Sequence, residues 1–219
     1  MSLSFRASVA PLDLSALNQL AQAIADPGFA IFPNFLAADI SQDLVTLIEE
    51  KILSNELKRA GIGKGIASQV HSEIRTDSIF WLDPNDSNTT AQRWLGAMDL
   101  LCAHLRSSLF LPVHSYEGHL ARYPGSGFYK AHLDQHQKSA ARQISIIIYL
   151  NEDWNASDGG QLRLYTDVSR GVKGPFIDVI PRFGTLVIFR SADFWHEVLP
   201  ASRSRLSLTG WLRGRDTPG

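Results

Sequence analysis

The stretch that decides the fold is Gln143-Ile144-Ser145-Ile146-Ile147-Ile148-Tyr149-Leu150. β-Branched and aromatic residues favour a strand, and so apolar a run predicts a central strand that is buried on both faces. Further short apolar segments with strand character lie around it from about residue 115 onward, separated by Gly, Pro, Asn and Asp. These segments are 116–123, 127–134, 161–165, 176–180, 185–189, 196–198 and 205–211.

The N-terminal half is instead helical in pattern. Apolar residues recur at helical spacing from Leu14 to Ile24, from Ile40 to Ile52 and from Trp94 to Leu105. Asp39 precedes Gln42 by three residues and resembles a capping box at the start of the second helix.

Between these helices the pattern is extended or irregular. Residues 29–35 predict an edge strand because Pro33 interrupts the apolar run. Residues 54–73 have weak periodicity and predict a mobile loop, whereas 74–82 predicts a strand. Helices followed by eight short strands indicate an α+β, mainly β fold: a double-sheet jelly roll with helices packed on one sheet. We expect one domain over 1–219, with mainly helical support in 1–113 and the jelly-roll core in 114–215.

Composition excludes several classes of protein. The chain has 219 residues, 20% of them charged, and a net charge of −1, so bulk electrostatics do not favour a nucleic-acid or anionic-membrane partner. The single cysteine, Cys102, cannot form an internal disulfide. The first residues lack a signal-peptide pattern, and no apolar run is long enough to cross a membrane. We expect a cytoplasmic monomer.

A metal site is suggested by His132-Leu133-Asp134. Residues i and i+2 of an extended segment point to the same face, so the imidazole and the carboxylate could share one ion. Alone, this pair is more typical of a surface turn. His196 lies in a later strand-like segment, and two histidines with one carboxylate form the ligand set of non-haem iron oxygenases.

Arg205 strengthens this hypothesis. It follows His196 by nine residues with a turn between them, which places it on the next strand facing the same interior. An arginine inside an apolar barrel requires an anionic partner, and its planar fork suits a ligand carboxylate. A solvated charge at a strand end is the alternative.

A set of motifs in this chain resembles the prolyl hydroxylases that modify hypoxia-inducible factor, and in particular their bacterial relatives. The motifs are Arg122-Tyr123-Pro124-Gly125, the segment Tyr129 to Asp134, Ile148 to Trp154, Gly159 to Leu164, Pro181-Arg182-Phe183, His196-Glu197-Val198 and Arg205. The resemblance extends to Gly28–Ile31, Asn34–Leu36, Ile74–Asp77 and Trp81, and so covers most of the chain.

The resemblance implies a double-stranded β-helix core and a dioxygenase that hydroxylates a prolyl residue of a protein. It implies Fe(II) at His132, Asp134 and His196, with 2-oxoglutarate and O2 as co-substrates and ascorbate as reductant. The distal carboxylate of 2-oxoglutarate would bind Arg205. The remaining residues of the co-substrate pocket would be Tyr123, Tyr149, Leu162, Ile147, Thr209 and Trp211.

At the entrance, the resemblance implies that Arg142, Arg75, Asp77 and Trp81 contact the protein substrate and that Tyr129 borders the metal. Each has a plainer interpretation: Trp81 as strand packing, Arg142 as a solvated charge, and Asp77 as a partner of Arg75. His119 replaces a usually apolar residue near the pocket, and Gly210 and Ser207 are unusually small.

Three other functions stay open on the sequence alone. The same site could oxidise a small molecule or another protein residue. A non-catalytic sensor of 2-oxoglutarate or metal would not need all four residues. A zinc hydrolase would need a general base and a bound water, and the sequence indicates no suitable Glu for this role, although Glu197 is adjacent to His196.

Overall fold

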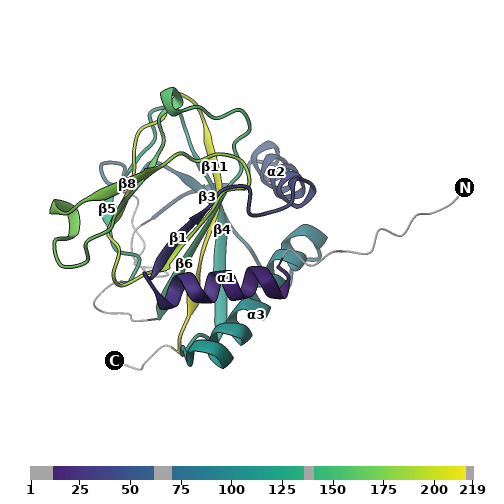
Figure 1. The fold of residues 1–219 in the computed structure, drawn as a ribbon. Coiled ribbons are helices and arrows are strands. Elements are labelled where there is room, and N and C mark those ends of the chain that lie inside the picture. The colour runs from purple at the N-terminus through teal and green to yellow at the C-terminus, as the bar shows by residue number, and fades with distance from the viewer. Residues whose placement is uncertain (1–11, 62–70, 136–140, 216–219) are drawn as a thin grey trace, which may run out of the picture.

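The computed structural model describes residues 12–61, 71–135 and 141–215. Two antiparallel sheets face each other, and the helices cover the outer face of the larger one (Figure 1). The helices are α1 (Leu14–Ala25), α2 (Ala38–Leu53) and α3 (Thr89–Leu109), with short 3-10 turns at Ala156–Asp158 and Gly171–Lys173. This is the predicted jelly roll with helices packed on one sheet.

The larger sheet has the strand order β1-β9-β6-β11-β4-β3-β2, and the smaller has β5-β10-β7-β8. The strands are β1 (Phe29–Phe32), β2 (Lys58–Arg59), β3 (Ser78–Trp81), β4 (Ser115–Tyr123), β5 (Tyr129–His132), β6 (Arg142–Tyr149), β7 (Leu162–Tyr165), β8 (Phe176–Val179), β9 (Leu186–Arg190), β10 (His196–Val198) and β11 (Arg205–Arg213). All eight strands predicted after residue 115 are present, and β1 lies at a sheet edge as predicted.

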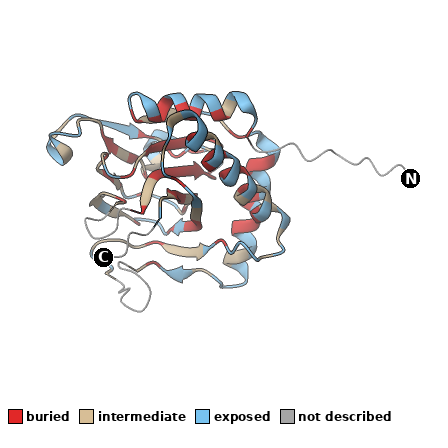
Figure 2. Cartoon of the chain, turned by 90° about the horizontal axis from the view of Figure 1, so that it is seen from below, coloured by how far each residue is buried: buried red, intermediate tan, exposed pale blue. Residues whose placement is uncertain are grey.

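The position of β6 in the larger sheet explains its nearly unbroken apolar run. It lies between β9 and β11, with both faces covered. Ile146 and Ile148 pack into the core beneath the helices, whereas Ile147 and Tyr149 pack inside the barrel between the two sheets. Figure 2 shows the same layering, with the buried faces of the helices turned toward the sheet. Because successive side chains of a strand point to opposite faces, the apolar residues of β6 contribute alternately to the core beneath the helices and to the core between the sheets.

Helix α1 starts where the sequence provides a cap, because Asp13 accepts a hydrogen bond from the Ala16 amide at 2.8 Å. The predicted capping box of α2 was wrong. Its N-cap is Ala37, which makes no side-chain cap bond, and Asp39 lies inside the first turn. There the carboxylate faces the positive end of the helix dipole, a favourable position that does not require a cap.

The predicted loop at 54–73 was also partly wrong, because β2 lies within it and pairs Lys58 with Ile79 and Arg59 with Ser78. A strand of two residues has no periodicity that a sequence could reveal. Residues 62–70 of that loop lie outside the described residues. The strand expected over 74–82 is shorter, with Arg75 making an isolated bridge to Tyr129 instead.

Two glycines allow the helical layer to contact the sheet closely. Gly118 on β4 and Gly210 on β11 are paired, and the ring of Tyr116 lies across both. The Tyr116 hydroxyl accepts a hydrogen bond at 3.0 Å from the indole of Trp94 on α3. A side chain at position 210 would occupy the space of this ring, which accounts for the small residue there. Among the described residues, no helix combines the length and the apolarity needed to cross a bilayer.

Candidate active site

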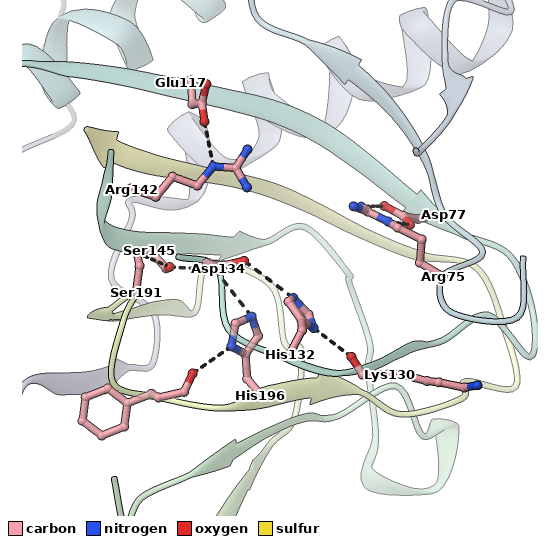
Figure 3. A network of polar contacts seen from close by, with 11 residues as sticks. Arg75, Asp77, Glu117, Lys130, His132, Asp134, Arg142, Ser145, Ser191 and His196 are labelled. Carbon is pink, nitrogen blue, oxygen red and sulfur yellow. Dashed lines mark hydrogen bonds and ion pairs between the residues drawn. The ribbon is translucent and has the colours of Figure 1, made fainter. Parts of the chain in front are cut away.

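His132, Asp134 and His196 come together at one end of the barrel (Figure 3). The pairing of β10 with β5 places His196 directly opposite His132. Nε2 of His132 lies 3.6 Å from Oδ1 of Asp134, and Nε2 of His196 lies 3.5 Å from Oδ2. All three donor atoms fall within 4.8 Å of one another. This spacing allows one ion to contact all three.

Hydrogen bonds orient each of these side chains. Nδ1 of His132 is 2.8 Å from the Lys130 carbonyl, and Nδ1 of His196 is 3.1 Å from the Phe194 carbonyl. A carbonyl accepts only, so Nδ1 carries the proton and the lone pair of Nε2 faces the cluster. The Ser145 hydroxyl donates to Asp134 at 2.7 Å. Metal sites in proteins orient their ligands in this way.

The electrostatics suit a cation. Burial lowers the pKa of His196 to about 4, with His132 adding to the effect, so this imidazole is neutral and able to bind metal. Burial raises the pKa of Asp134, but the adjacent His196 and His132 outweigh it and hold the pKa well below its usual range. Imidazole nitrogens and carboxylate oxygens are the donors typical of non-haem Fe(II) sites.

Arg205 lies deep in the same pocket and is 2% exposed. Its Nε donates to the Gly160 carbonyl at 2.9 Å, and its guanidinium faces the rings of Tyr123 and Tyr149 at 5.2 and 4.9 Å from their centroids. Across the described residues, no carboxylate forms an ion pair with it. A buried guanidinium of this kind favours an anionic ligand in the pocket.

A pocket of about 1140 Å³ joins the cluster, Arg205 and the surface. Most of the side chains expected around the co-substrate and the entrance line it. They are Tyr123, Ile147, Leu162, Thr209, Trp211, Tyr129, Arg142, Arg75 and Trp81.

Two predicted residues lie behind the wall rather than on it. Tyr149 is fully buried against Arg205, and burial raises the pKa of Tyr149 to about 12. Asp77 is 1% exposed and accepts two hydrogen bonds from Arg75, one of them from Nε at 2.7 Å. Asp77 therefore positions Arg75. Of the two roles considered for Asp77 from the sequence, this is the partner of Arg75 rather than a contact with the substrate.

Several residues of the site were not predicted. Ser145 and Ser191 share a hydrogen bond of 2.8 Å beside Asp134, and Glu117 binds Arg142 at 2.7 Å. Glu117 alternates with His119 and Tyr123 on β4, so the period of two could have indicated a residue facing the pocket. His119 does line the pocket, packed between the rings of Trp81 and Trp211.

Comparison with known proteins identifies the family and supports the fold. Residues 118–213 match the family described as the 2OG-Fe(II) oxygenase superfamily. A solved structure of a Pseudomonas putida prolyl-4-hydroxylase is 37% identical, covers 91% of this chain and 99% of its own, and superposes with a TM-score of 0.79. The chain belongs to the 2OG-Fe(II) oxygenase superfamily.

Two further members of this superfamily are similar to the chain. A Caenorhabditis elegans hypoxia-inducible factor prolyl hydroxylase is 32% identical over 84% of this chain. The chain spans about a quarter (26%) of that relative's length. A Trichoplax adhaerens prolyl hydroxylase, solved with a peptide fragment of the hypoxia-inducible factor oxygen degradation domain, is 25% identical and covers 91% of this chain and 89% of its own, with a TM-score of 0.78. The family resemblance and the fold class drawn from the sequence are confirmed.

Proposed function

We propose that this oxygenase hydroxylates a prolyl residue in a protein substrate, using Fe(II), 2-oxoglutarate and O2 with ascorbate as reductant. The observation that carries the proposal is the His132–Asp134–His196 cluster in one pocket with Arg205, a buried arginine that lacks an anionic partner among the described residues. Proline as the target is supported by the prolyl-4-hydroxylase that matches nearly the whole of this chain.

His132, Asp134 and His196 would hold the iron from one side and leave its remaining positions open to the pocket. When bound, the iron supplies the oxidation of a C–H bond by O2, in which 2-oxoglutarate is converted to succinate and CO2. The carbonyls of Lys130 and Phe194 fix the orientation of the two imidazole rings, and the Ser145 hydroxyl fixes that of the Asp134 carboxylate.

Arg205 would bind the distal carboxylate of 2-oxoglutarate with its free guanidinium nitrogens, since its Nε is already engaged by Gly160. Thr209, Leu162 and Ile147 line the space between this anchor and the metal cluster. The side chains of Tyr123 and Tyr149 pack against the guanidinium and exclude water, which strengthens its attraction for a carboxylate. Trp211 and Tyr129 would bound the target residue on the entrance side.

The Arg205→Ala variant tests the co-substrate assignment. Losing a charge-assisted pair of this kind costs about 1.5–3 kcal/mol, so 2-oxoglutarate should bind about 10- to 100-fold more weakly by calorimetry. Arg203→Ala is the matched control, because Arg203 is a solvent-exposed arginine in the turn before β11, where it pairs with Asp158. Equal affinity in Arg205→Ala and wild type would refute the assignment.

We propose further that residues 1–219 form a single oxygenase domain that acts as a cytoplasmic monomer, with neither a nucleic acid nor a membrane as partner. The net charge of −1 supports the proposal that neither a nucleic acid nor an anionic membrane is a partner.

A further inference from the structure

Positive charge is concentrated around the mouth of the pocket. Although the whole chain has a net charge of −1, the side chains lining the outer part of the pocket include five cations and two carboxylates. The cations are Lys58, Arg59, Arg75, Arg142 and Arg213, and the carboxylates are Glu56 and Glu117. An excess of one sign at the entrance of a cleft selects ligands of the opposite sign.

The two carboxylates do not neutralise this excess. Glu56 is already bound by Lys51 at 3.1 Å and by the Ser54 hydroxyl at 2.6 Å. Glu117 is shared between two guanidinium groups, Arg142 at 2.7 Å and Arg213 at 3.2 Å. Arg75, in contrast, has a carboxylate to itself, that of Asp77 (Figure 3).

Two sides of the mouth therefore carry cations. On one side, the guanidinium groups of Arg142 and Arg213 face the one carboxylate of Glu117. On the other, Lys58 and Arg59 on edge strand β2 are exposed and form no ion pair with the described residues.

Arg142 is fixed in place. Its guanidinium lies 3.4 Å from the centroid of the Trp211 ring while its Nε is bound by Glu117, so two contacts hold it in one orientation. Its side chain is still 28% exposed, which leaves donors accessible at the pocket mouth. A cation held in this way loses little side-chain entropy when it binds a carboxylate.

We propose that the mouth of the pocket recognises acidic side chains in the protein segment that flanks the target residue. One acidic residue would pair with Arg142 beside Glu117 and another with Lys58 and Arg59, so that the target residue lies between them and faces the His132–Asp134–His196 cluster. The inference rests on the proposed function, because it names the chemistry of the substrate segment for the same site.

The test uses two fluorescent peptide pools with a central proline and randomised flanks, identical except that one contains Asp and Glu where the other contains Asn and Gln. Binding to protein loaded with Fe(II) and 2-oxoglutarate is measured anaerobically by anisotropy. The acidic pool should bind about tenfold more tightly at low ionic strength, and salt should reduce the difference because exposed charges are screened.

Three variants make the test specific. The double variant Lys58→Gln/Arg59→Gln should lose most of the preference for the acidic pool, whereas Lys173→Gln, at an exposed lysine away from the pocket, should keep it. Glu117→Gln should increase the preference, because it removes the carboxylate that competes for Arg142 and Arg213. Equal binding of the two pools, or binding of neither, would overturn the proposal.

Admitting O2 and measuring peptide mass separates this inference from the proposed function. Preferential binding of the acidic pool without oxygen added to proline would uphold the acidic recognition and refute prolyl hydroxylation. Equal oxygenation of both pools, with equal affinities, would refute the acidic recognition and leave prolyl hydroxylation standing.

Discussion

Replacing Gly210 by alanine should destabilise the protein because the new methyl group would overlap the Tyr116 ring. That ring cannot move aside easily, since it is partly buried between the larger sheet and α3 and its hydroxyl is bound by the Trp94 indole at 3.0 Å. Overpacking costs about 1–3 kcal/mol, and losing the hydrogen bond adds about 0.5–1.5 kcal/mol. Alanine also lowers the conformational entropy of the unfolded chain, which stabilises the folded state by about 0.4–1 kcal/mol. The free energy of unfolding should therefore fall by about 2 kcal/mol.

Urea denaturation followed by tryptophan fluorescence measures this change, with an expected loss of about 6 °C in Tm as a second readout. Gly96→Ala is the matched control: Gly96 lies on the exposed face of α3 with no atom within 4 Å of an added methyl group, so alanine should stabilise by about 0.5–1 kcal/mol. In a Tyr116→Ala background, Gly210→Ala should cost much less, because the overlap is gone. A neutral Gly210→Ala in the wild-type background would refute the packing argument.

Two further predictions concern a buried thiol and the metal cluster. Cys102 is buried, and burial raises the pKa of its thiol to about 11. The native protein should therefore react with iodoacetamide at pH 8 far more slowly than the urea-unfolded chain. Similar rates in the two states would contradict the burial of Cys102. Mn(II) replaces Fe(II) in the second test. At a hundredfold excess over Kd, binding should stabilise the wild type by about 2.7 kcal/mol, which raises its Tm by about 8 °C. The Tm of His196→Ala should stay nearly unchanged. Equal shifts in both proteins would place the metal elsewhere.

The sequence predicted most of the fold because periodicity carries that information. The apolar run at 143–150 indicated a central strand, and β6 lies between β9 and β11. The sequence also allowed three metal ligands to be grouped. The spacing of His132 and Asp134 places them on the same face of a strand, and His196 completes the ligand set of a non-haem iron site. Strand pairing in the structure then placed His196 opposite His132.

What the sequence could not show depends on long-range contacts. The two-residue strand β2 exists only because β3 offers it an edge. Glu117 acquires its role from arginines 25 and 96 residues away. Gly210 is small because of a tyrosine on a neighbouring strand, and no local pattern encodes that requirement.

The central claim is tested most directly by incubating the purified protein with Fe(II), 2-oxoglutarate, ascorbate, isotopically labelled O2 and the acidic proline peptide pool. The account predicts that succinate forms together with peptides that gain one labelled oxygen on proline, and that His132→Ala yields neither product. Absence of succinate from the wild-type protein, or succinate formation that persists in His132→Ala, would contradict it.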